Sequence, residues 1–154
     1  MPGLRLWSTC EHDCRIMTIP PRFEISAAQI DQIVAVFYNR VRAHPMLGPI
    51  FAAHVTDWPK HEAKIAAFWR NAIIYERGYD GNPMAVHQAA GNVRPGHFTP
   101  WLALFDAVLA GQLPPDTAAG FSALAHRIGR GLRMAVADPH RIPGAPPNLR
   151  GSLF

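Results

Sequence analysis

The sequence predicts an all-α domain, and three observations lead to this fold class. Apolar residues recur at helical spacing in several segments. Residues that favour helix N-caps precede these segments, and prolines or glycines separate them. No segment shows the strict alternation of a half-buried strand. We therefore expect one helical domain over residues 25–138, between a flexible tail at 1–24 and a flexible, proline-rich tail at 139–154.

Composition agrees with a packed domain. Of the 154 residues, 49% are hydrophobic and 17% are charged, which is enough apolar side chain for a core. The net charge of +4 is scattered without a run of five basic residues, so we expect no nucleic-acid partner. No apolar stretch is long enough for a membrane span, and charged residues interrupt the first twenty positions, so we expect neither a membrane segment nor a signal peptide. Cys10 and Cys14 are expected as free thiols in a reducing cytoplasm, with a strained disulfide or a weak metal site as alternatives.

The first half of the domain predicts two long helices joined by a corner. Ser26 is a good N-cap for a helix over 26–44, and Pro45 ends that helix. A short helical corner follows at 47–53. Asp57 then caps the next helix, whose first turn contains a proline. One face of this helix carries the residues His61, Ile65, Phe68, Trp69 and Ala72.

The second half predicts a short helix followed by two longer ones. Asn82 is an N-cap candidate, and Gly91 is a natural stop, so they enclose a helix of about two turns. A helix this short is marginal alone, so another bond must hold it. Further apolar stripes predict helices over 99–110 and 116–137.

Three polar rings occur in these apolar helices. Tyr38, His61 and His87 each occupy a different segment, and a buried phenol or imidazole needs a partner. An iron-bearing cofactor with a polar ligand on its far face would partner all three. Haem binding is therefore the leading hypothesis.

Five motifs, in their order and spacing, resemble those of the truncated haemoglobins, above all the third group. The motifs are Phe37-Tyr38, Leu47-Gly48-Pro49-Ile50-Phe51, Trp58 with His61 and Phe68-Trp69, Gly81-Asn82-Pro83-Met84 with His87, and Phe98 with Trp101-Leu102-Ala103-Leu104-Phe105. The resemblance covers about residues 26 to 137. The third group lacks the Gly-Gly pairs of other truncated globins, and this chain has none. The two tails depart from the family.

The resemblance implies a two-over-two globin sandwich holding haem b (iron protoporphyrin IX). It implies that His87 is the iron ligand and that Tyr38, His61 and Trp101 line the opposite, distal side. It also implies an apolar cage made of Phe37, Phe51, Ile65, Phe68, Trp69, Met84 and Phe98. Lys64, Arg94 and His97 are candidates to pair with the haem propionates.

The expected roles follow from the donors that each side chain carries. His87 should give one ring nitrogen to iron and donate from the other to a carbonyl or water. The Tyr38 hydroxyl and the Trp101 indole N–H suit a ligand with partial negative charge. His61 has three possible roles: it donates to the ligand, it gates the pocket, or it binds iron when no ligand is present.

We therefore expect a cytoplasmic haem protein that binds dioxygen and other iron ligands such as nitric oxide, carbon monoxide or cyanide. Several distal donors imply slow release, which favours oxygen, nitric-oxide or peroxide chemistry over transport. An enzyme of this kind, peroxidase-like or a nitric-oxide dioxygenase, would need an external reductase, because the chain has no Gly-x-Gly-x-x-Gly motif. Two alternatives stay open: a haem-based sensor or interaction module without turnover, and a haem-free helical regulator.

Overall fold

The all-α prediction is confirmed. The computed structural model describes residues 19–138, and this part of the chain contains helices and no strand. The helices are α1 (Ala27–Ala43), α2 (Leu47–Ala52), α3 (Trp58–Ile74), α4 (Pro83–Ala89), the 3-10 helix η1 (Pro95–His97), α5 (Phe98–Gln112) and α6 (Pro115–Ala137). No helix within 19–138 has both the length and the apolar character needed to cross a bilayer.

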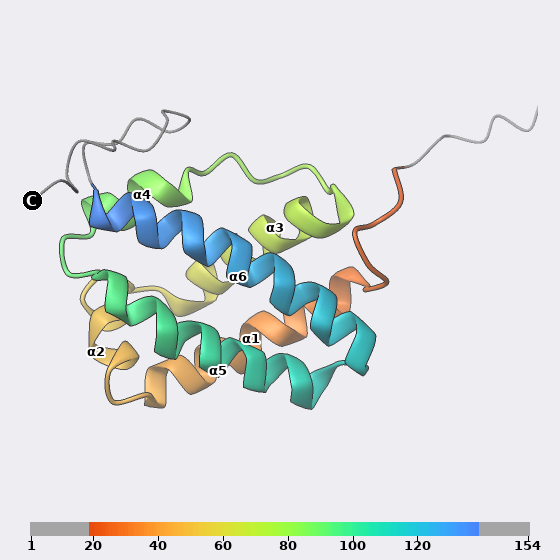
Figure 1. Ribbon diagram of the computed structural model, residues 1–154, viewed down its shortest axis with the longest axis horizontal. Coiled ribbons are helices and arrows are strands. Elements are labelled where there is room, and N and C mark those ends of the chain that lie inside the picture. Colours follow the sequence, from red (N-terminus) through yellow and green to blue (C-terminus); the bar gives the residue numbers. More distant parts are fainter. Residues whose placement is uncertain (1–18, 139–154) are drawn as a thin grey trace, which may run out of the picture.

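The long helices form two stacked pairs (Figure 1). α1 packs against α3, α5 packs against α6, and contacts between α1 and α5 join the two pairs. This is the predicted two-over-two sandwich. The two short helices lie at its margins, since α2 packs on α1 and α4 packs on α6. The helices that carry His61 and His87 thus pack against different long helices, α3 against α1 and α4 against α6.

The turn between α1 and α2 is set by side-chain caps and a glycine. Ser26 and Gln29 form a capping box at the start of α1. His44 follows α1, and its Nδ1 accepts the backbone N–H groups of Met46 and Leu47, at 3.2 and 3.1 Å. Gly48 lets α2 approach α1 closely, because a Cβ there would lie 2.8 Å from a backbone oxygen of α1.

The two helices that carry the candidate histidines start as the sequence predicts. The Asp57 side chain accepts the backbone N–H of Lys60, three residues on, and so caps α3. Asn82 does the same for Ala85 at the start of α4. Gly91 follows α4 with φ of 74°, a left-handed conformation that favours glycine.

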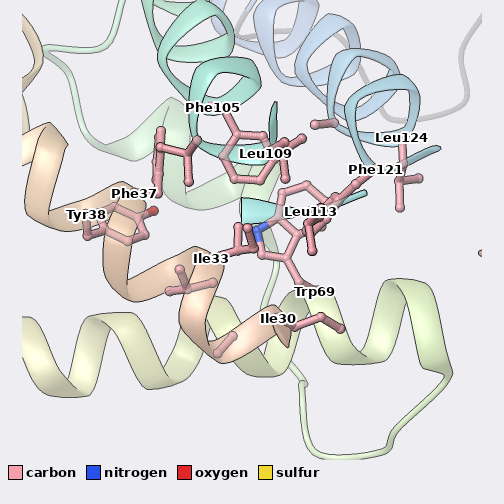
Figure 2. Packing of buried hydrophobic residues seen from close by; sticks show 14 of the residues in the cluster. Ile30, Ile33, Phe37, Tyr38, Trp69, Phe105, Leu109, Leu113, Phe121 and Leu124 are labelled. Carbon is pink, nitrogen blue, oxygen red and sulfur yellow. The ribbon is translucent and has the colours of Figure 1, made fainter. Parts of the chain in front are cut away.

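The core is centred on the ring of Phe105, which is 1% exposed (Figure 2). Its centroid lies 5.0 Å from Phe37, 5.5 Å from Trp69, and 5.3 Å from both Trp101 and Phe121. These rings come from α1, α3, α5 and α6, so one aromatic cluster holds both helix pairs together.

Packing begins earlier in the chain than predicted. The boundary was expected at residue 25, yet the Arg22 backbone N–H donates to the Ile73 carbonyl at 3.0 Å. Phe23 packs on Phe121 with centroids 5.7 Å apart. Residues 22–24 therefore belong to the packed domain rather than to the tail. Residues 1–18 of the predicted N-terminal tail and all of the predicted C-terminal tail at 139–154 lie outside the described residues.

Candidate functional site

His87 is placed with one ring nitrogen already engaged. Its Nδ1 lies 2.6 Å from the carbonyl oxygen of Pro83, one turn earlier on α4. Since a carbonyl only accepts, Nδ1 is the protonated nitrogen and Nε2 carries a free lone pair. Phe98 flanks the half-buried ring, with centroids 5.9 Å apart. This is the tautomer and orientation that a histidine needs to bind iron through Nε2.

The short helix α4 is anchored to α6. Gln88 donates from Nε2 to the carbonyl of Ala135 at 3.0 Å. Met84 packs beside Gly131, where an added Cβ would lie 3.5 Å from the methionine Cε. No residue of α4 is fully buried, so this helix has little core of its own. These contacts set the position of His87 relative to the sandwich.

Tyr38 and His61 meet across the α1–α3 pair. Their ring centroids lie 4.9 Å apart, nearly perpendicular. The Nε2 atom of His61 is buried, and within residues 19–138 it has no hydrogen-bond partner. Burial, and then the nearby charge of Lys64, lower the pKa of His61. A neutral imidazole therefore keeps an unsatisfied polar atom in the protein interior, where a ligand or a water would satisfy it.

The Tyr38 hydroxyl is a donor without a protein acceptor in the described part of the chain. The residue is 3% exposed, and no hydrogen bond from its hydroxyl to another residue of 19–138 is formed. Burial, and then the Glu62 carboxylate, raise the pKa of Tyr38 far above its ordinary value. The hydroxyl therefore stays protonated, and it is available to donate.

Trp101 is brought to the same end of the core by α5. Its ring stacks on Phe105 and meets Phe37 edge-on at 5.2 Å, and Phe37 in turn contacts Tyr38 at 5.1 Å. Its indole N–H has no hydrogen-bond partner in the 19–138 region. Trp101 is only half-buried, unlike Phe37 and Phe105. Trp101 thus carries another unpaired N–H and is joined to the Tyr38 ring through Phe37.

The predicted cage residues fall into two groups. Large apolar side chains that are only partly buried leave surface available to a flat apolar ligand, and these are Phe51, Ile65, Phe68 and Met84. Phe37, Trp69 and Phe98 are at least 94% buried by protein alone. Trp69 packs between Phe105 and Phe121, deep in the core. Any contact of these three with a cofactor stays a prediction.

The predicted propionate partners lie at the surface or close to it. Lys64 and Arg94 are exposed, and His97 is half-buried in η1. The backbone N–H of Arg94 donates to Nδ1 of His97 at 3.1 Å, which leaves Nε2–H of that imidazole as its outward donor. All three side chains are free to pair with an anionic group, and that role stays a prediction.

Tyr79 is a site-bordering residue that the sequence reasoning missed. Its ring contacts Phe68 at 5.3 Å and lies against Gly81, where an added Cβ would clash with it. Burial, and then the charge of Asp80, raise its pKa. Its position before the Gly81-Asn82-Pro83 motif is the one sequence signal for it, and that signal is weak.

A second missed feature joins the two margins of the site. His54 Nε2 lies 2.6 Å from Oδ1 of Asn92, and Asn92 donates from Nδ2 to the Ile50 carbonyl at 3.3 Å. The loop after α4 is therefore tied to the α2 corner. His54 and Asn92 are 38 positions apart, and residue spacing in the sequence does not predict a contact over that separation.

Lys64→Ala is expected to raise the pKa of His61 while leaving it below the ordinary 6.5, because burial remains the larger cause. The midpoint can be measured by NMR titration of the imidazole in the ferrous carbonyl form, with Lys60→Ala as a control on the same helix. With the folded pKa below 6.5, the unfolded chain binds the proton more readily, so folding stability falls as pH drops below 6.5. A midpoint at or above 6.5 in the parent protein would contradict this assignment.

These residues fit a haem. One imidazole offers a free Nε2 from α4, and α3, α1 and α5 contribute unpaired polar groups, with half-buried apolar rings among them. A haem held by histidine needs one axial imidazole nitrogen, apolar side chains against the porphyrin and, for hydrogen bonding of a ligand, polar groups toward the second axial position. The donor set matches these requirements.

The chain is similar to a known protein in sequence and to a solved structure in fold. Group 3 truncated haemoglobin ctb of Campylobacter jejuni is 33% identical over 93 residues, which span 57% of this chain and 73% of the relative. The crystal structure of a group III truncated haemoglobin from Campylobacter jejuni superposes with a TM-score of 0.71 at 26% identity, over 77% of this chain and 97% of that one. No family model matches the chain.

Proposed function

We propose a specific use for this site, starting from the fact that the chain belongs to the group 3 truncated haemoglobins and so binds small gas ligands at a haem iron. The proposal is that Tyr38, His61 and Trp101 hold a diatomic ligand by hydrogen bonds, with His87 as the axial ligand. When bound, the haem would supply the iron that takes up the gas. The side chains supply the axial nitrogen and the hydrogen bonds that hold the ligand.

The observation that supports this proposal most is the buried, unpartnered Nε2 of His61 beside the Tyr38 ring. An unsatisfied buried polar atom costs about 1–3 kcal/mol, so it persists where a ligand satisfies it. His61 is kept neutral by its lowered pKa, and Tyr38 is kept protonated by its raised pKa. These two side chains therefore offer hydrogen-bonding groups without a net charge.

Haem b is the form of the cofactor that this chain suits. Covalent attachment of a c-type haem uses Cys-x-x-Cys-His, and this chain has Cys10 and Cys14 at a different spacing, without a following histidine. Retention of a haem that is not covalently attached then depends on His87, the apolar rings and the residues that pair with the propionates. Lys64, Arg94 and His97 are the proposed partners, because each has a polar group free to face outward.

Tight hydrogen bonding of bound dioxygen favours its reaction at the site over its delivery to another protein. Donors that slow the release of dioxygen also keep it in place for a second reactant such as nitric oxide. Conversion of nitric oxide and dioxygen to nitrate consumes one electron, so an external reductase is part of the proposal. Reduction of a peroxide is the second reaction that the same donors would assist.

The test combines release and reaction. Dioxygen release is followed by stopped flow after rapid mixing with carbon monoxide, and nitrate is measured after nitric oxide is added to the oxygenated protein. Slow release together with one nitrate per haem is expected, and a chemical reductant should sustain turnover. Slow release without nitrate or peroxide turnover would support a sensor instead, and fast release would overturn the distal assignment.

A further inference from the structure

Arg42 joins the two helices that carry the distal donors. It lies on α1, one turn after Tyr38, and its Nη2 donates to Glu62 Oε1 at 2.6 Å. Its guanidinium carbon lies 4.8 Å from the ring centroid of Trp58, and its Nε lies 3.3 Å from the Tyr38 carbonyl oxygen. One side chain thus makes an ion pair, a cation–π contact and a backbone hydrogen bond.

The two α3 partners of Arg42 flank His61 in the sequence. Trp58 precedes it by three residues, and Glu62 follows it directly. The Trp58 ring contacts His61 at 6.0 Å and Tyr38 at 6.2 Å. Trp58 therefore touches both distal rings and the Arg42 guanidinium.

His61 has little else to fix its ring. Its Nε2 makes no hydrogen bond within the described chain, and its neighbours are the rings of Tyr38, Phe51 and Trp58. Trp58 is itself only half-buried, and it is the first residue of α3. The orientation of His61 thus depends on a ring that needs its own support.

We propose that Arg42, acting through Trp58 and Glu62, is the positioning residue that holds His61 beside Tyr38 at the ligand site. This inference rests on the proposed function, in which His61 faces the ligand. Only a planar guanidinium can stack on the indole while donating to the carboxylate, so Lys at this position restores the charge without the geometry. We call the contacts of Arg42 with Trp58 and Glu62 the clamp. The Arg42 side chain is 41% exposed, so its ion pair with Glu62 weakens as salt is added.

The first test follows the His61 ring protons by NMR in the ferrous carbonyl protein, where ring currents from the porphyrin, Tyr38 and Trp58 displace them. In Arg42→Met, the signals are expected to move toward their positions in unstructured peptides, with Arg42→Lys in between. Arg40→Met is the control, since Arg40 is exposed on the same helix and makes no ion pair or hydrogen bond within 19–138. Unchanged His61 signals in Arg42→Met overturn the proposal, and Glu62→Met serves as the second variant if Arg42→Met does not fold.

The second test is a double-mutant cycle on carbon monoxide association, measured by flash photolysis. Arg42→Met is expected to change the rate constant by about threefold to tenfold in the parent and by less than twofold in His61→Ala. An equal effect in both backgrounds would show that Arg42 acts elsewhere and overturns the proposal. If His61→Ala alone leaves association unchanged, the distal role of His61 is what fails, and the NMR shifts alone then decide whether the clamp exists.

Discussion

Replacing His87 with alanine is expected to lower the affinity for haem by at least about 100-fold, the largest effect of any single substitution in this protein. In the proposed function, a coordinate bond from Nε2 would be the one strong link between α4 and the cofactor. The helix has seven residues and no fully buried side chain, so it cannot replace that link by packing. Loss of the bond should also loosen α4 itself, since iron ligation and helix formation support each other.

The measurement is a titration of purified protein with hemin, followed in the Soret band, with and without added imidazole. Imidazole should restore a stable complex in His87→Ala by taking the vacated coordination position. His126→Ala is a suitable control, because His126 pairs with Asp106 across α5 and α6. A native-like five-coordinate spectrum of His87→Ala without imidazole would show that another residue binds iron.

Helix starts were predictable from the sequence because their determinants are local. Ser26, Asp57 and Asn82 each accept the backbone N–H three residues later, and this interaction needs only the correct residue at the correct spacing. The position of His87 on α4 follows from the same local rule. The sequence therefore indicated where each candidate histidine would lie along its helix.

Features that depend on tertiary contacts were not predictable in this way. The C-cap of α3, Tyr75, takes φ of 58° although it is neither glycine nor asparagine, and the guanidinium carbon of Arg22 lies 5.9 Å from the centroid of its ring. Phe23 joins the core only because Phe121, about a hundred residues away, is beside it. Both contacts depend on how distant segments fold together, and a local sequence pattern does not predict such contacts.

The candidate site shows the same division. Helical periodicity puts Phe68 and Trp69 on one apolar face, but it cannot tell which side of that face meets a cofactor and which meets the core. In the structure Phe68 keeps exposed surface, whereas Trp69 is 3% exposed among Phe105 and Phe121. The contacts of Arg42 with Trp58 and Glu62 could not be predicted from the sequence, because a charged residue on a helix surface is more often exposed to solvent without a partner.

Removing the distal donors is the second prediction with a large effect. Tyr38→Phe and Trp101→Leu should each speed dioxygen release by about fivefold or more, since a net hydrogen bond contributes about 1 kcal/mol and 1.4 kcal/mol is about tenfold. Tyr38→Phe removes only the hydroxyl, so the 5.1 Å contact with Phe37 remains. Trp101→Leu also removes the stacking on Phe105, so Trp101→Phe is needed to separate the N–H from the ring.

Stopped-flow release from the oxygenated protein measures these effects, with Tyr75→Phe as a control that removes an exposed hydroxyl on the far end of α3. If both donors reach the same ligand, the double variant should release dioxygen faster than either single variant, and its effect should differ from the product of the two single effects. Release at the parent's rate in both single variants would mean that the unpaired hydroxyl and indole N–H do not face the ligand, and the polar interior would then need a different explanation.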